Sequence, residues 1–111
     1  MKRNKNRKTP SWYFCTYLQG LFRNIVEQAE NSGIQNELLD KSQGILCAFD
    51  EAFEDVNNKQ KRILQLYFVG ELSYSEIAEH ERVSYYQVEK TVRTIVQAVD
   101  EKLEKNKENE E

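Results

Sequence analysis

The sequence of 111 residues is poor in the residue types that carry most metal and enzyme chemistry. It has two cysteines and one histidine, too few ligands for a structural zinc site, which takes four Cys or His side chains. We expect Cys15 and Cys47 to be reduced core residues, because both fall on apolar helix faces, and His80 to be a bystander. The chain has no glycine-rich phosphate loop and no nucleophile with a base nearby. We therefore expect neither an enzyme nor a bound metal or cofactor.

Long apolar runs are also lacking. The aromatic stretch after Pro10 has about eleven residues, whereas a membrane-spanning helix needs about 20. The first residues lack the apolar segment of a secretory signal. These two absences predict a cytoplasmic protein with no membrane partner.

Charge is distributed unevenly along the chain, although the net charge is only −3. Residues 1–8 hold five bases and no acid, whereas residues 27–58 hold eight acids against Lys41. Residues 59–99 are balanced, with six bases and five acids. A protein that is acidic overall can still bind DNA when its basic groups share one face.

The two ends of the chain are too polar to fold alone. Residues 1–8 are predicted to form a disordered basic arm, which either lies on DNA phosphates or in a minor groove, or serves only as a solubilising tail. Residues 105–111 are predicted to be a polar tail that frays.

Residues 9–56 are predicted to form an N-terminal helical part with two amphipathic helices. The first has Thr9 as N-cap and Pro10 at its first position, and Gly33 suits the left-handed residue that ends it. The second covers residues 35–56, and Gly44 marks a point where it can split. The apolar stripe of the first helix is Phe14, Leu18, Leu21, Phe22 and Ile25. The apolar side of the second is Leu38, Leu39, Ile45, Leu46, Phe49, Phe53 and Val56.

Residues 57–104 contain two helix starts of the same kind. Ser73 to Glu76 and Ser84 to Gln87 both have the capping-box pattern, in which a serine accepts from the third backbone N–H and Glu or Gln reaches back. The first start leaves room for about two turns, and the second opens a much longer helix. A short helix, a tight turn and a long helix are typical of a helix-turn-helix. The alternative is a helical hairpin in an ordinary bundle.

The helix-turn-helix interpretation predicts which side chains face inward and which face DNA. Ala78 lets the two helices approach, Val83 fills the turn and Val88 faces the core. Polar and aromatic residues at the start of a second helix suit base-edge readout in a major groove. Lys90 and Arg93 would supply charge for phosphates. The DNA-facing set on this helix is Ser84, Tyr85, Tyr86, Gln87, Glu89, Lys90 and Arg93.

A preceding helix is predicted over residues 59–69. Its start carries three bases at a place where helix-turn-helix proteins commonly touch the DNA backbone. These bases are Lys59, Lys61 and Arg62. Its core residues are Ile63, Leu64, Tyr67 and Phe68.

This region resembles the fourth conserved region of bacterial sigma factors, the module that reads the upstream promoter element. The matching segments are Lys59 to Phe68, Glu71 to Glu79, Val83-Ser84 and Val88 to Lys90. The resemblance implies duplex DNA as the target and RNA polymerase as a second partner, in a regulator of bacterial or phage type. It gives no target sequence, because Tyr85 to Gln87 replace the family's basic-acidic-basic run.

A second departure from that family lies in the turn. Glu81 and Arg82 stand where the family usually has leucine and glycine. A non-glycine residue at positive φ costs about 1 kcal/mol, so we expect a turn of different shape.

The long final helix carries an apolar stripe well beyond the helix-turn-helix. The stripe is Val88, Val92, Ile95, Val99 and Leu103, with Val96 beside it. Its later part must pack either on the N-terminal aromatic helix or on the same helix of a second subunit, which would make a homodimer.

The sequence thus predicts an all-α protein, a small helical bundle with a C-terminal helix-turn-helix and a long final helix. It predicts a DNA-binding transcriptional regulator. The alternative is a protein-interaction module of sigma-like fold that binds polymerase or another regulator without reading DNA. The low positive charge of residues 59–99 and the acidic Glu89 support this alternative.

Overall fold

The computed structural model describes residues 9–33 and 37–109, which form six α-helices and no strand. This arrangement confirms the all-α class and the long final helix. The predicted arm, residues 1–8, lies outside the described residues. The helices are α1 (Ser11–Leu18), α2 (Leu21–Asn31), α3 (Glu37–Ala52), α4 (Asn58–Phe68), α5 (Tyr74–Glu81) and α6 (Tyr85–Asn109).

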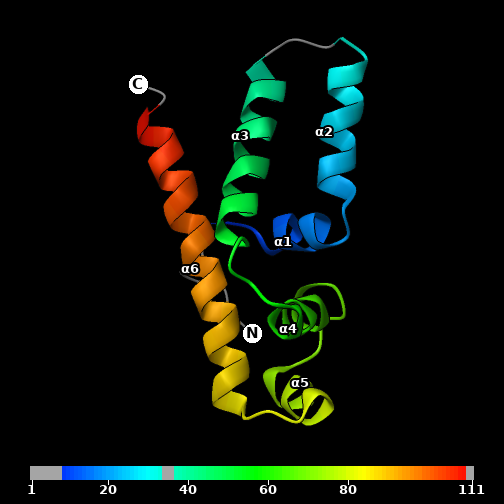
Figure 1. Ribbon diagram of the computed structural model, residues 1–111, viewed down its shortest axis with the longest axis vertical. Helices are drawn as coiled ribbons and strands as arrows, with labels where there is room; N and C mark the ends of the chain where they lie inside the picture. The colour runs from blue at the N-terminus through cyan, green and yellow to red at the C-terminus, as the bar shows by residue number, and fades with distance from the viewer. Residues whose placement is uncertain (1–8, 34–36, 110–111) are drawn as a thin grey trace.

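The helices are arranged around α3 and α6 (Figure 1). α6 runs along α3 and contacts α4 and α5 near its beginning. α2 lies on the other side of α3, and α1 crosses the base of the α2–α3 pair and contacts α4. The molecule is elongated, measuring 46 × 28 × 27 Å, with α5 and the start of α6 at one end.

The main hydrophobic core joins the N-terminal helices to the helix-turn-helix. Phe14 of α1 is fully buried and stacks on Phe68 of α4, with ring centroids 4.5 Å apart. The same ring meets Phe49 of α3 edge-on at 5.0 Å. The other buried members are Leu18, Ile63, Leu64, Tyr67, Ile77, Val88, Val92, Ile95 and Val99.

The prediction of one helix from Thr9 to Gly33 is wrong, because the chain breaks at Gly20. Gly20 has φ +79 and its N–H donates to Tyr17 O at 3.0 Å. Glycine adopts this left-handed conformation without steric cost. Thr9 is not the cap either, since its buried hydroxyl hydrogen-bonds to Asp100 of α6.

The break also changes which residues of α2 face inward. Val26, 3 % exposed, packs against Leu39 and Leu46 of α3 in a second, smaller cluster. Leu21 and Ile25 were expected on the core side but are 49 % and 62 % exposed. The restart at Gly20 turns α2 relative to α1, so a single helical stripe does not run through both.

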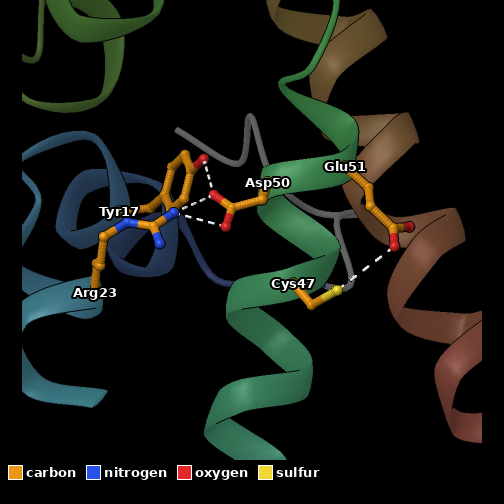
Figure 2. Close-up of polar contacts among 5 residues, drawn as sticks. All are labelled: Tyr17, Arg23, Cys47, Asp50 and Glu51. Carbon is orange, nitrogen blue, oxygen red and sulfur yellow. Dashed lines mark hydrogen bonds and ion pairs between the residues drawn. The ribbon is translucent and has the colours of Figure 1, made fainter. Parts of the chain in front are cut away.

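Three polar side chains hold α1 and α2 against α3 (Figure 2). The Tyr17 hydroxyl donates to Asp50 Oδ1 at 2.6 Å, and Arg23 Nη2 donates to both Asp50 carboxylate oxygens at 2.5 and 2.6 Å. Burial and the hydrogen bond to Asp50 raise the pKa of Tyr17. We call this group the Asp50 clamp. It links three helices through one carboxylate.

Other predictions for α3 and α6 were partly wrong. α3 is not split at Gly44, and Leu38 is 72 % exposed. Cys47 is exposed on the flank of α3 where Glu51 pairs with Lys102 of α6 at 3.6 Å. Its thiol contacts Glu51 at 3.5 Å, and this contact raises the pKa of Cys47. The later stripe of α6 packs within the chain, but on α3 instead of the aromatic helix α1. α6 continues to Asn109, into the predicted tail.

Candidate nucleic-acid interface

The helix before the helix-turn-helix is fixed by its own capping box. The Asn57 side chain accepts from the Gln60 N–H at 2.8 Å, and the Gln60 side chain accepts from the Asn57 N–H at 3.0 Å. Its four predicted core residues are all buried. The bases Lys59, Lys61 and Arg62 are exposed at this start, as a DNA-backbone contact would require.

The first helix of the motif, α5, begins at the predicted capping box. Ser73 Oγ accepts from the Glu76 N–H at 3.1 Å, and the Glu76 carboxylate accepts from the Ser73 N–H at 2.9 Å. Both bonds satisfy backbone N–H groups that have no partner within the helix at its start. Ile77 is fully buried and anchors α5 to the core.

The turn between α5 and α6 keeps a left-handed residue without a glycine. Arg82 has φ 59 and ψ 46, and the Val83 N–H donates to Ala78 O at 3.0 Å. The expectation of a turn with another shape at this residue is therefore wrong. Because an L-residue in this region costs about 1 kcal/mol, the surrounding contacts must compensate.

Glu81, which precedes that residue, is one such contact. Its side chain is only 8 % exposed and its carboxylate accepts from Arg62 Nε of α4 at 3.1 Å. The other carboxylate oxygen lies 3.0 Å from His80 Nδ1. Hydrogen bonds from His80 and then Arg62 hold the pKa of Glu81 below its ordinary range. A charged pair thus ties the end of α5 to α4.

The second helix, α6, starts at Ser84. Ser84 Oγ accepts from the Gln87 N–H at 3.0 Å, which is the serine half of the predicted capping box. Val88 and Val92, 0 % and 1 % exposed, hold this part of α6 on the core. The opposite side of the helix is therefore turned to solvent.

The tyrosines at this start are mostly exposed, Tyr85 by 55 % and Tyr86 by 61 %. Tyr85 meets the ring of Tyr74 on α5 edge-on at 5.6 Å, and Tyr74 stacks on the buried Tyr67 at 5.2 Å. The three rings form a ladder from the core to the surface. The Tyr74 ring of α5 thus fixes the position of the Tyr85 ring at the start of α6.

The charged residues of this face are partly paired. Arg93 Nη1 lies 3.0 Å from Glu89 Oε2, one helical turn away. Lys90 lies between them in sequence and is exposed. Among the residues that the structure describes, four cations near the motif have no ion-pair partner. They are Lys59, Lys61, Arg82 and Lys90.

An open groove of about 710 Å³ runs along one flank of α6. Four of the predicted residues line it together, whereas Tyr85, Glu89 and Arg93 lie outside it. The four are Ser84, Tyr86, Gln87 and Lys90. The opposite wall comes from the end of α3, the loop after it and the start of α4, with Ala52, Asp55 and Gln60.

Sequence reasoning missed several residues beside the predicted set. Thr91 and Thr94 continue the groove wall after Gln87 at helical steps of four and three, a spacing that the sequence displays. Arg82 is exposed at the turn. Its charge lies beside the predicted DNA-facing residues at the start of α6.

The comparison with protein families fits this geometry. The model of the family UPF0122, described as "Putative helix-turn-helix protein, YlxM / p13 like", matches residues 34–111. The chain belongs to this helix-turn-helix family. The match covers α3 to α6 and begins after the end of α2, so α1 and α2 lie outside it.

No curated protein and no solved structure matches the chain. Among the described helices, none is long and apolar enough to cross a membrane.

Proposed function

We propose that this chain is a DNA-binding transcription regulator that places the first turns of α6 in the major groove of duplex DNA. One observation carries the proposal: Tyr86, Lys90 and Arg93 face solvent at one end of the molecule while Val88 and Val92 hold the same turns on the core. The family match supports the helix-turn-helix. In this proposal the chain acts in the cytoplasm and catalyses no reaction.

The side chains divide into two roles. Tyr85, Tyr86 and Gln87 contact base edges, because they are at the helix start where a recognition helix is closest to the bases. The unpaired cations contact phosphates. With about four such contacts, we expect a slope of log affinity against log salt of about −4.

The resemblance to the fourth region of sigma factors supports a promoter element as the target and RNA polymerase as a second partner. The competing function is a protein-interaction module that has lost DNA reading. The observation that favours it is the Glu89–Arg93 pair, which leaves a carboxylate on the recognition face and neutralises one of its cations.

Fluorescence anisotropy of a labelled duplex, selected from random DNA with the full chain, separates the two functions. Lys90→Ala should weaken binding and reduce the salt slope by about 1. Glu89→Gln should act oppositely, since it frees Arg93 for a phosphate, and should strengthen binding and steepen the slope.

Glu101→Gln is the matched control, because it removes the same charge from an exposed position farther along α6. It should leave the slope unchanged. If all three variants bind like the parent, or if no duplex binds in a salt-dependent way, DNA reading is wrong and the interaction module is favoured.

A further inference from the structure

Six large hydrophobic side chains are exposed in the described part of the chain. Tyr85 and Tyr86 belong to the recognition face, and Leu38 stands at the start of α3. The remaining three lie on α1 and α2. They are Trp12, Leu21 and Ile25, exposed by 62 %, 49 % and 62 %.

These three residues belong to one continuous surface. The Trp12 ring meets Tyr13 at 4.3 Å, and Tyr13 meets Phe22 of α2 at 6.3 Å, both edge-on. Ile25 lies three residues after Phe22 and four after Leu21 on α2, so its side chain adjoins both. We call Trp12, Tyr13, Leu21, Phe22 and Ile25 the α1–α2 surface.

The fold does not use the outer side of this surface. α2 is an edge helix that packs on α3 and α1, on the side of α3 away from α6 (Figure 1). Val26 and the Asp50 clamp hold it there. Leu21 and Ile25 therefore stabilise the protomer little, and an exposed apolar patch on a rigid support is typical of an interaction site.

Charge is absent from the outer side as well, although about a third of the chain is charged. α1 has no charged residue. On α2 the positions that share the outer side with Leu21 and Ile25 are Asn24, Gln28 and Ser32, all uncharged. The charges of α2 lie away from Leu21 and Ile25: Arg23 binds Asp50, Glu30 accepts from Gln43, and the exposed Glu27 is two positions from Ile25 and so does not share its side of the helix.

This charge pattern favours a second copy of the chain as the partner. A nucleic acid would need lysine or arginine here, and a basic protein would need carboxylates. A two-fold interface brings each patch against its own copy, so like charges on it would oppose one another. The uncharged α1–α2 surface meets that condition, whereas the acidic residues 27–58 as a whole do not.

We propose that two copies of this chain associate through the α1–α2 surface, with Trp12, Leu21 and Ile25 in the interface centre. The stripe of α6 that sequence reasoning offered for a homodimer is covered by α3 within the protomer. The family match does not include α1 and α2, so this proposal does not rest on it. It does not depend on DNA binding.

Sedimentation velocity of the full chain without DNA, over a range of concentrations, tests the proposal. The parent should shift from monomer to dimer, and Ile25→Glu or Leu21→Glu should each raise the dimer Kd at least about tenfold, because a carboxylate in an apolar interface centre is costly. Leu38→Glu is the matched control, an exposed leucine at the far end of the α2–α3 pair, and should leave the Kd unchanged.

Two further readouts make the outcome unambiguous. At a protein concentration at which the parent is monomeric, the thermal midpoint of Ile25→Glu should equal that of the parent, since this side chain is exposed, so loss of the dimer cannot be ascribed to unfolding. The dimer should persist at high salt, because no ion pair holds it. A parent that stays monomeric at every concentration, a dimer lost at high salt, or a dimer unaffected by both glutamate variants would overturn the proposal.

Discussion

Two segments of this protein have the same plan, an eight-residue helix, a left-handed residue and a longer helix. In the first, α1 is followed by Gly20 with φ +79 and then by α2. In the second, α5 is followed by Arg82 with φ 59 and then by α6. Both turns change the direction of the chain within a few residues. Only the second lies at the recognition face.

The two segments differ in what fixes their helix ends. α5 has a complete capping box, and Ser84 caps the start of α6. Neither α1 nor α2 has a side-chain cap, and each begins after a residue that cannot supply one, Pro10 and Gly20. Local hydrogen bonds therefore define α5 and α6, whereas tertiary contacts define α1 and α2.

The largest expected effect follows from this dependence on tertiary contacts. Phe14→Ala removes a fully buried ring that packs on both Phe49 and Phe68, and should lower the free energy of unfolding by about 3 to 5 kcal/mol. Urea unfolding followed by circular dichroism measures it. Trp12→Ala is the control, since that ring on the same helix is 62 % exposed, and all proteins are compared at a concentration at which the parent is monomeric.

The Trp12 variant should cost about 0.5 kcal/mol or less, as surface substitutions usually do. Equal losses for the two variants would mean that α1 is not anchored through the core. The Asp50 clamp would then be the contact that holds α1 on the rest of the molecule.

The same difference explains how far sequence reasoning reached. Short sequence patterns were enough to predict the serine caps at Ser73 and Ser84 and the core residues of α4. The structure confirms these positions. The break at Gly20 could not, because a stripe with steps of three and four fits one helix as well as two. The Tyr17–Asp50 bond, which fixes the end of α1 on α3, joins residues 33 apart in sequence.

The candidate site was predictable to a similar degree. The outward direction of Lys90 and Arg93 follows from the buried Val88 and helical periodicity. The Glu89–Arg93 pair has the spacing of a helical ion pair and could have been anticipated. The Arg62–Glu81 pair could not, because it joins two helices whose relative placement the sequence does not give.

A pH experiment tests whether that inter-helix pair stabilises the second segment. The folded-state pKa of Glu81 is depressed, by hydrogen bonds from His80 and Arg62, below the ordinary value of about 4.3. Its contribution is therefore present above about pH 4.3 and is lost as the pH falls through the folded-state pKa. Glu81→Gln should cost about 1.5 kcal/mol at neutral pH, the low end for a charged hydrogen bond, because Arg62 is largely exposed.

The cost of Glu81→Gln should shrink toward zero in acid, measured by urea unfolding at neutral pH and at about pH 3. Glu79→Gln, an exposed position on the same helix, should leave the free energy of unfolding unchanged at both pH values. A cost for Glu81→Gln that stays constant with pH would show that the packing of this side chain matters and its charge does not.

The smallest effects come from exchanging the residue types of the two turns, and they should have opposite signs. Gly20→Ala places a Cβ where no atom lies within 4 Å, so the positive φ costs about 1 kcal/mol, and the lower unfolded-state entropy offsets about 0.5 kcal/mol of it, which leaves a net destabilisation of about 0.5 kcal/mol. Arg82→Gly relieves a similar strain of about 1 kcal/mol but adds about 0.5 kcal/mol of unfolded-state entropy, which leaves a net stabilisation of about 0.5 kcal/mol. Thermal unfolding of both variants beside the parent measures the two shifts.

A destabilising Arg82→Gly would mean that the arginine side chain stabilises the turn, because a glycine backbone is under no greater strain in the left-handed conformation than an arginine backbone. If instead the signs are as expected, the second segment tolerates a strained turn because its caps hold both helices, whereas the first, which has none, depends on glycine.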